Sequence, residues 1–412
     1  MIEQRVEKHK IKQNSPYYAM LDDFCFKAKN LYNHALYVVR NEFIKNGKWI
    51  RYNELDKILK NDTAYPDYKN MPTAQSAQQL LKLVDKNFKS FFELIKLYRK
   101  NKDTMDKPNL PKYKKKSGRF PLILTNQEAR YKNGVISFPK AFNGFTLTPQ
   151  FNTKAKFVSF QQIRIIPRNK CFMIELVYRV DTGEMKPDNG RYLGIDLGVN
   201  NLAAVSNNVG EVPFIIDGRG IKSVNQWYDK QIAHYNSINM SMHKNKKCGY
   251  TKRLYALTDK RNMRMDDCMH KASRIIVERA AAMDISTIVI GQDYDWKRDS
   301  NIGTQNNQMF TQIPHMDLIN KITYKAKEYG ISVVTTEEMF TSGTSFLDNE
   351  LPIEANYNIS RRKKRGLFIS NEGFRINADT NAAFQMIKKV FPDAFGQWNS
   401  GCAYHPVKVT AI

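Results

Sequence analysis

Cysteine is scarce in this chain of 412 residues, and its few copies fall in no recognisable pattern. The five cysteines are Cys25, Cys171, Cys248, Cys268 and Cys402, and no two of them form a CxxC pair. This scatter gives no support to a disulfide framework or to a zinc knuckle. We therefore expect a chain that holds no zinc and works in a reducing cytoplasm.

Long apolar segments are also missing. No apolar run reaches the roughly 18 residues that a membrane-spanning helix needs. The first residues, MIEQRVEKHKIK, are charged and contain no apolar signal core, which argues against secretion. The chain also has no Walker A loop, no G-x-G-x-x-G fingerprint and no Ser/His/Asp pattern. These absences disfavour a membrane protein, a P-loop nucleotidase, a dinucleotide-dependent enzyme and a serine hydrolase.

Acidic residues are outnumbered. The chain has 40 Asp and Glu against 65 Lys and Arg, a formal net charge of +25, and a sequence pI near 9.6. A basic excess of this size favours a polyanionic partner. A membrane surface would require a basic amphipathic helix with a clear apolar face, and no terminal helix of that kind stands out. Nucleic acid is therefore the expected partner.

The first 180 residues have the pattern of helices followed by strands. Apolar residues recur at helical spacing over 17–46 and 73–99, and Thr73 is a suitable N-cap for the second helix. Apolar and polar residues alternate over much of 121–182, between turn signals. With a possible strand at 1–14, this pattern predicts a small β-barrel.

A polar linker, DTGEMKPDNGR, follows, and it predicts a domain boundary near residue 190. Beyond it, three short strands (YLGIDLG, NLAAVSNN and EVPFIID) precede helices and strands in alternation, an α/β layout. This order matches that of an RNase H-like nuclease domain. The later elements are expected as helices at 221–241, 251–283, 315–329 and 377–390, and as strands at 286–291 and 331–338.

Two aspartates lie where carboxylates suit metal chemistry. Asp196 ends an apolar run in RYLGIDLGVNNLAAVS, and Asp379 begins an amphipathic helix in GFRINADTNAAFQMI. Each has an ordinary alternative: a strand-end turn for Asp196, and a carboxylate favoured by the helix dipole for Asp379. Taken together in this strand order, they indicate a two-metal nuclease site. Carboxylates in such sites hold two Mg²⁺ ions at the scissile phosphate.

Several motifs resemble a known family. GIDLGVNNLA and INADTNAAFQM resemble the first and third RuvC motifs of TnpB, the transposon-encoded relative of compact type V CRISPR effectors. DKNFKSFFELIKLYRK, MHKASRIIVERA and NNQMFTQIP are also similar to the family, so the resemblance runs from about residue 70 to 390. It implies an RNA-guided DNA endonuclease of the prokaryotic cytosol or nucleoid. A single Mg²⁺-dependent RuvC site would cut the target DNA.

The partners that the resemblance implies are a guide RNA and a target DNA, the latter as a duplex with a short flanking motif and as a separated strand. The implied fold is α/β and multidomain: a RuvC nuclease domain, a β-barrel wedge domain and a helical recognition lobe. The expected segments are a wedge strand at 1–16, the recognition lobe at 17–120, the wedge barrel and linker at 121–190, RuvC at 191–340 and 373–412, and a target-binding insertion at 341–372.

The chain departs from the family pattern at the third carboxylate. The usual glutamate follows the STIVI strand, where this chain has Gly291-Gln292. The next strand, ISVVTTEE, ends in Glu337-Glu338, and some family members resemble this arrangement. Successive strand residues point to opposite faces, so only one of the two would face the metals, and we favour Glu337. If both are surface acids, the chain is a nuclease-inactive, RNA-guided DNA-binding protein. A protein-only transposon nuclease is a further alternative.

The second departure lies in the insertion, which lacks the two CxxC pairs that the family often carries. Basic residues there and in two other segments are expected to contact phosphates, with aromatic residues available for base stacking. The alternatives are a flexible charged linker for 99–119, an exposed helix face for the basic zone around 244–261, and a solvated loop for 361–365. The expected nucleic-acid-binding residues are Lys112, Tyr113, Lys114, Lys115, Lys116, Arg119, Lys246, Lys247, Lys252, Arg253, Arg361, Arg362, Lys363, Lys364 and Arg365.

Overall fold

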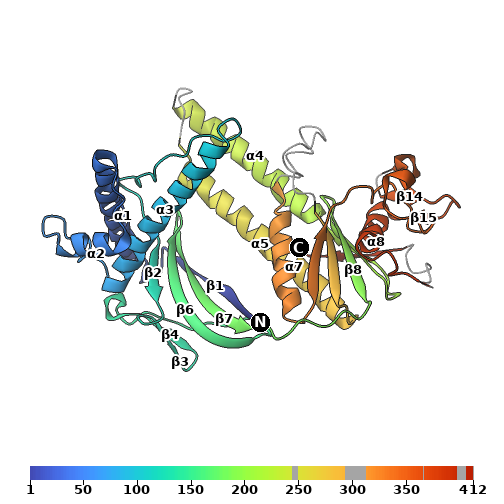
Figure 1. Ribbon diagram of the computed structural model, residues 1–412, viewed down its shortest axis with the longest axis horizontal. Helices are drawn as coiled ribbons and strands as arrows, with labels where there is room; N and C mark the ends of the chain where they lie inside the picture. The colour runs from blue at the N-terminus through green and yellow to red at the C-terminus, as the bar shows by residue number, and fades with distance from the viewer. Residues whose placement is uncertain (244–248, 293–311, 365, 397–404, 412) are drawn as a thin grey trace. The chain divides into compact units, whose positions relative to one another are not determined.

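A computed structural model describes residues 1–243, 249–292, 312–364, 366–396 and 405–411 (Figure 1). The chain divides into two compact units, Ile2–Asp181 and Thr182–Ile412, and Met1 belongs to the second. The division falls at the first residues of the predicted linker. Each unit combines helices with a sheet, so the α/β prediction is confirmed at this level. Among the described helices, none combines the length and the apolar character that a membrane crossing requires.

The first unit contains two antiparallel sheets. Its larger sheet has the order β1-β7-β6-β2, and β1 pairs with β7 along its whole length. The smaller sheet has the order β3-β4-β5. The strands are β1 (Ile2–Lys12), β2 (Leu122–Thr125), β3 (Arg130–Lys132), β4 (Val135–Ser137), β5 (Thr146–Leu147), β6 (Lys156–Pro167) and β7 (Cys171–Asp181).

The expected β-barrel is not closed by hydrogen bonds within the part of this unit that the structure describes. The larger sheet ends at β1 on one side and at the four-residue strand β2 on the other. Two register shifts between β6 and β7 accompany the curvature of these long strands. The remaining predicted strands pair among themselves in the smaller sheet, so they cannot close the larger one.

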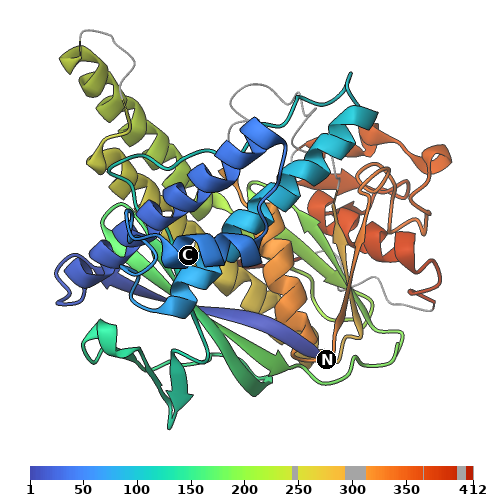
Figure 2. The ribbon, with the colours of Figure 1, turned by 60° about the vertical axis from the view of Figure 1, so that its left-hand side comes forward.

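The three helices of this unit are α1 (Tyr18–Asn46), α2 (Tyr52–Asn61) and α3 (Ala74–Lys100); α1 and α3 contact the larger sheet, and α2 packs on these two helices. Helices α1 and α3 pack on each other and on the strands, as Figure 2 shows. Thr73 caps α3 as predicted, because its hydroxyl accepts a hydrogen bond of 3.1 Å from the backbone N–H of Ser76.

The second unit is built on a six-stranded sheet of order β12-β11-β8-β9-β10-β16. The first three strands along the chain, β8 to β10, form an antiparallel meander, and β11 and β12 extend it in parallel with β8. The edge strand β16 was not predicted, and it pairs in parallel with β10. The strands are β8 (Tyr192–Leu197), β9 (Asn201–Asn207), β10 (Phe214–Asp217), β11 (Thr287–Gly291), β12 (Ser332–Thr336) and β16 (Val407–Thr410).

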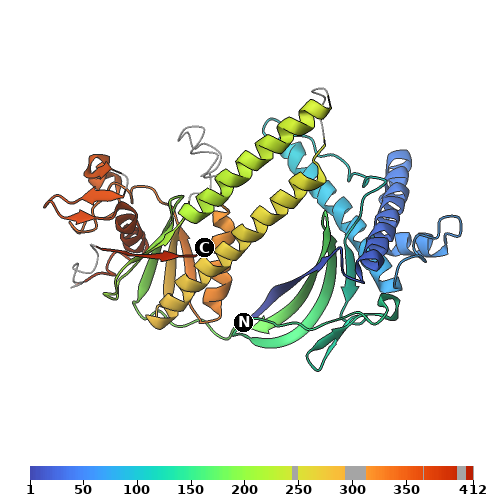
Figure 3. The ribbon, with the colours of Figure 1, turned by 180° about the vertical axis from the view of Figure 1, so that it is seen from behind.

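Four helices were predicted in this unit, and all four are present. They are α4 (Arg219–Met242), α5 (Lys252–Ala282), α7 (His315–Lys327) and α8 (Ala378–Val390). Helices α4 and α5 pack on each other as a long antiparallel pair, visible in Figure 3. Between β12 and α8, the insertion forms a small sheet that was not predicted, of β13 (Arg362–Lys364), β14 (Leu367–Ile369) and β15 (Arg375–Ile376).

Helix α8 lies unusually close to β8, and Gly194 is the reason. A Cβ atom at Gly194 would lie 2.1 Å from the carbonyl oxygen of Ala383 and 2.8 Å from Cγ1 of Ile387. Both distances are far shorter than a van der Waals contact, so no larger residue fits between strand and helix. This contact fixes the height at which α8 crosses the strand that carries Asp196.

Replacing Gly194 with alanine is therefore expected to destabilise the second unit. The new methyl group must push α8 off the sheet, and overpacking of this kind costs roughly 1–3 kcal/mol. Urea unfolding followed by circular dichroism should show a lower midpoint. Gly249→Ala is the matched control, because nothing lies within 4 Å of a Cβ atom there. Equal midpoints for the two variants would contradict the tight packing of α8.

Candidate active site

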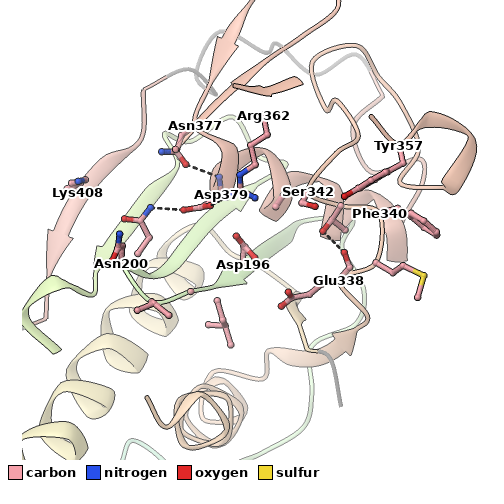
Figure 4. A pocket seen from close by; sticks show the side chains of 18 of the residues that line it. Asp196, Asn200, Glu338, Phe340, Ser342, Tyr357, Arg362, Asn377, Asp379 and Lys408 are labelled. Atoms are coloured by element: carbon pink, nitrogen blue, oxygen red, sulfur yellow. Dashed lines mark hydrogen bonds and ion pairs between the residues drawn. The ribbon is translucent and has the colours of Figure 1, made fainter. Parts of the chain in front are cut away.

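Asp196 and Asp379 come together at one end of the sheet in the second unit. Asp196 is the penultimate residue of β8, which lies between β9 and β11. Asp379 lies in the first turn of α8, where Asn377 caps the helix by accepting hydrogen bonds from the N–H groups of Asp379 (3.0 Å) and Thr380 (3.1 Å). Both aspartates line a cavity of about 990 Å³ (Figure 4).

The surroundings of Asp196 make its carboxyl group harder to ionise. Burial and the negative charge of Asp379 raise the pKa of the Asp196 carboxyl well above its usual range, and only the nearby Arg362 acts in the opposite direction. A carboxylate held beside another in a poorly solvated place is ionised at a cost. A bound cation would remove this cost, so the electrostatics of the pair suit a metal site.

Asp379 is held on both oxygens by side chains from other elements. Nδ2 of Asn201, the first residue of β9, donates a hydrogen bond of 2.7 Å to Oδ2. The guanidinium of Arg362, the first residue of β13, forms an ion pair with Oδ1 at 2.9 Å. The sequence did not single out Asn201 or Asn377, although both lie within the two motifs that carry the aspartates.

The structure places Glu338, rather than Glu337, in the cavity. Strand β12 ends at Thr336, so the strict alternation of strand side chains no longer applies to the two glutamates. Glu337 is exposed, and Glu338 is half-buried. The geometry therefore favours Glu338 over Glu337, because the preference for Glu337 assumed that the strand continued through both residues.

Glu338 also fills the space above the strand end where the family pattern has its glutamate. A Cβ atom at Gly291 would lie 2.9 Å from Cγ of Glu338 and 2.3 Å from Cε of Met386. The absence of a side chain on Gly291 therefore makes room for Glu338. The loss of one acid and the gain of the other are linked by packing.

The three carboxylates share the cavity without already forming a coordination shell. Among the described residues, no group of three or more His, Cys, Asp or Glu side chains converges closely enough to hold an ion. Arg362 takes one oxygen of Asp379 instead. The donor set is nevertheless one of hard oxygen ligands, which suits Mg²⁺.

Two segments of the chain match models of known protein families. Residues 175–297 match a family model described as a probable transposase, OrfB of IS605, and residues 315–386 match the TNB domain of Cas12f1-like proteins. The first match contains Asp196, and the second contains Glu338, Arg362 and Asp379. The TnpB-like protein ORF457 of Acidianus two-tailed virus is 23% identical over 392 residues, which cover 87% of this chain and 80% of that protein. These matches support the resemblance of the chain to the TnpB family.

A second relative is the CRISPR-associated endodeoxyribonuclease Cas12f1 of Syntrophomonas palmitatica. It is 24% identical over 347 residues, which cover 79% of this chain but just under two thirds, 65%, of that protein. Among solved structures, the chain aligns with a protein chain from a Cas12f1–sgRNA–target DNA complex. The alignment covers 93% of this chain and 98% of the other, with 16% identity and a TM-score of 0.36.

The basic run of the insertion does not present a uniform surface. Arg361 is buried and paired with Glu350 at 2.7 Å, so it is not available to a phosphate in this conformation. Arg362 lines the cavity, whereas Lys363 and Lys364 are exposed. Arg365 lies outside the described residues, as do Lys246 and Lys247. Of the predicted residues in the α4–α5 region, Lys252 and Arg253 are exposed.

The basic segment 111–119 of the first unit is fixed on α1 rather than loose. Side chains on one side of α1 hold its backbone: Arg40 donates to the carbonyl of Pro111 (2.8 Å), and Asn33 both donates to the carbonyl (3.0 Å) and accepts from the N–H (2.8 Å) of Lys114. Lys29 bonds the carbonyl of Lys116 at 2.8 Å. We call this segment the basic strap.

The arginine of the basic strap is paired with an acid, whereas the lysines of the strap are exposed. Arg119 forms a two-point ion pair with Asp22, at 2.8 and 2.6 Å, so it secures the end of the strap. The intervening predicted residues, Lys112, Tyr113, Lys114, Lys115 and Lys116, are exposed. The alternative of a flexible charged linker is thus replaced by an ordered segment that displays four lysines.

The raised pKa of Asp196 predicts how metal-free stability depends on pH. In the unfolded chain the pKa of an aspartate is about 3.9, and in the folded protein the pKa of Asp196 is higher. At pH values between the two, the folded protein binds one proton more than the unfolded chain. Stability attributable to Asp196 is therefore lost as pH rises through the folded pKa. Asp196→Asn should raise the melting temperature in EDTA at pH 7.5 by on the order of 2–4 °C for each kcal/mol recovered.

This gain should disappear below about pH 4, where the wild-type carboxyl is neutral in both states. Thermal unfolding of both proteins across pH 3.5–8 measures it. Asp393→Asn, at an exposed position of the same unit, is the control and should change little. A wild type that is more stable than the Asp196→Asn variant at pH 7.5 without metal would show that the carboxylate is already compensated.

Proposed function

We propose that this TnpB-like protein is an RNA-guided DNA endonuclease that hydrolyses target DNA in a single RuvC-type, metal-dependent site. The observation that carries the proposal is the meeting of Asp196 and Asp379 in one cavity, where Asp379 helps to raise the pKa of Asp196. The two aspartates lie in separate matched segments of the chain. A carboxylate with a raised pKa, beside a second carboxylate at the end of a sheet, is an arrangement that a divalent cation would stabilise.

Asp196, Asp379 and Glu338 would hold Mg²⁺. The ion, when bound, would neutralise charge on the scissile phosphate and promote attack by water. Asn201 keeps Asp379 oriented through its hydrogen bond, and Asn377 fixes the start of α8. Arg362 supplies a guanidinium that can turn from Asp379 to a phosphate oxygen, a pairing that guanidinium groups form readily.

The remaining segments have roles in this proposal that follow the family. In the second unit, 191–340 and 373–412 form the RuvC domain, and 341–372 is a target-binding insertion that needs no zinc. In the first unit, 1–16 and 121–190 act as the wedge, and 17–120 as the recognition lobe. Together they would hold the guide RNA and its duplex with target DNA, whose sequence is then read by base pairing.

A second candidate function is guided DNA binding without cleavage. It is favoured by one observation: within the described ranges no three acids converge on a common point. A protein of this kind would act as a repressor. A protein-only transposon nuclease is the third candidate, and it predicts that no RNA copurifies with the chain.

Cleavage of a matched DNA target by the protein copurified with its RNA distinguishes these candidates. We expect Mg²⁺-dependent cutting that Asp196→Ala abolishes while RNA binding is retained. Glu338→Gln should reduce the cutting rate by more than the roughly 10–100-fold that loss of an outer-shell group costs. Glu337→Gln is the matched control, because it makes the same change at the exposed neighbour.

The link between Gly291 and Glu338 allows a rescue. In the double variant Gly291→Glu with Glu338→Ala, the new side chain enters the space that Glu338 leaves, and part of the lost rate should return. Guide-dependent binding without any cutting by the wild type would favour the repressor. Cutting that survives Glu338→Gln but not Glu337→Gln would assign the third ligand to Glu337.

The basic strap should contribute to RNA binding through its lysines, which can pair with phosphates. Removing one such pairing should make the slope of log K against log salt shallower by about 0.7–0.9. We therefore expect Lys112→Gln with Lys115→Gln to weaken binding of an RNA duplex, measured by fluorescence anisotropy at several salt concentrations. Lys60→Gln, an exposed lysine on α2, is the control. An unchanged slope in the double variant would exclude the strap from the RNA interface.

A further inference from the structure

Arg361 lies at the centre of a buried polar cluster in the insertion. Its Nη1 forms an ion pair with Oε1 of Glu350 at 2.7 Å and lies 3.7 Å from Oδ2 of Asp348. Its Nη2 donates to the carbonyl of Asn356 at 2.6 Å. The side chain is only 10% exposed. One guanidinium therefore connects three separate points of the insertion.

The partners of Arg361 are themselves fixed to the backbone. Glu350 accepts a hydrogen bond from the N–H of Ser345 at 2.8 Å, and Asp348 accepts one from the N–H of Asn371 at 2.8 Å. The segment has no cysteine and only short strands, so these charged side chains cross-link its turns. We call this group, Asp348, Glu350 and Arg361, the insertion clasp.

Helix α8 anchors the insertion clasp. Nε2 of Gln385 donates to the carbonyl of Glu350 at 3.2 Å, and Nζ of Lys388 donates to the carbonyl of Asn349 at 2.7 Å. Near the start of the helix, Nδ2 of Asn381 donates to the carbonyl of Thr344 at 2.8 Å, and Oδ1 accepts from the N–H of Phe346 at 2.9 Å. Buried polar groups of this kind hold a fixed geometry because leaving any of them unpaired costs about 1–3 kcal/mol.

Arg361 is followed directly by Arg362, and the two side chains form ion pairs with different residues. Arg361 ends a short 3-10 helix and reaches into the insertion clasp, while Arg362 begins β13 and reaches Asp379. The contacts thus run from α8 to Glu350, then to Arg361 and Arg362, and return to α8 at Asp379. A displacement of Arg361 would move the first residue of β13 and draw Arg362 away from the acid.

We infer that Arg361, held by Asp348 and Glu350, is a positioning residue that sets the guanidinium of Arg362 against Asp379. The inference rests on the proposed function in one respect, namely that Asp379 is a metal ligand. Because Arg362 occupies one oxygen of Asp379, a metal ion must compete with it. The insertion clasp therefore controls how readily the acidic cavity accepts Mg²⁺, although none of its residues lines the cavity.

A double-mutant cycle on the full chain tests this, with Mg²⁺ affinity measured by calorimetry in the absence of nucleic acid. Arg362→Gln should tighten Mg²⁺ binding by roughly tenfold, the order expected when a charge-assisted hydrogen bond no longer competes. Arg361→Gln should tighten it in the same direction. In the Arg362→Gln background, Arg361→Gln should have no further effect, because the competing guanidinium is already absent.

Two further variants keep the result interpretable. Glu350→Gln removes the main partner of Arg361 without deleting the arginine, and it should tighten Mg²⁺ binding as Arg361→Gln does. Lys363→Gln removes an exposed charge from the same run and should leave the affinity within about twofold, as expected of a surface charge. Arg361→Gln with wild-type or weaker Mg²⁺ affinity would overturn the inference, whatever its melting temperature, because a residue with only a structural role predicts that result.

Failure of the metal site can be recognised separately. If no variant, including the wild type, binds Mg²⁺, the proposed function fails at its metal site, and the inference is then decided by hydrogen exchange in the metal-free protein. Arg361→Gln and Glu350→Gln should accelerate exchange of the amides of β13 and β14 relative to the wild type. Arg362→Gln should not, since Arg362 is held by the clasp and does not form it. Equal exchange in all three variants would overturn the inference.

Discussion

The contact between α8 and β8 at Gly194 is the constraint on which the site depends. Only a residue without a side chain allows the backbone of Ala383 to lie so near the strand. Asp196 follows Gly194 by two positions, and Asp379 precedes Ala383 by about one helical turn, so this one contact sets the separation of the two carboxylates. Their mutual repulsion, seen in the raised pKa of Asp196, is therefore imposed by packing. Folding energy holds two like charges together, and a cation can return part of that energy on binding.

Helix α8 also connects the site to the insertion, and this double role explains the composition of the helix. The side of α8 that meets the sheet has small and apolar residues, among them Ala382, Ala383 and Ile387. Its other side buries Asn381, Gln385 and Lys388, which bind carbonyl groups of the insertion. A helix buried on both sides would ordinarily be apolar all round. Here the polar side satisfies turns that have no regular partners, so α8 transmits the position of the insertion to Asp379.

The sequence predicted what depends on periodicity and left open what depends on tertiary packing. The helices α4, α5, α7 and α8, the strands β8 to β12, and Thr73 as a cap follow from local spacing and were predicted to within a few residues. The edge strand β16 was missed because its alternation, Val-Lys-Val-Thr, is only four residues long and becomes significant only through pairing with β10. Asp196 and Asp379 were identified from their motifs. Glu338 was not preferred, since the end of β12 at Thr336 is decided by the turn that follows. The burial of Arg361 was likewise hidden, because a run of five basic residues does not reveal which one meets Glu350.

The charges that line the cavity are balanced, as the proposed function requires of a site that would accept both a cation and a polyanion. Three acids, Asp196, Glu338 and Asp379, face three basic residues, Arg219, Arg362 and Lys408, so the lining is formally neutral although the chain carries +25. A surplus of acids would repel a phosphate before any metal arrived, and a surplus of bases would exclude the metal. Because the charges are balanced, whether a cation or a phosphate would bind first depends on which acid already has a basic partner. At Asp379 that partner is Arg362. Arg361 cannot pair with Asp379 or with a phosphate in this conformation, because its charge is already matched by Glu350 and Asp348. The adjacent arginines thus have different surroundings: Arg361 is buried and paired with acids of the insertion, whereas Arg362 lines the cavity, where the proposed function would have it exchange an aspartate for a phosphate.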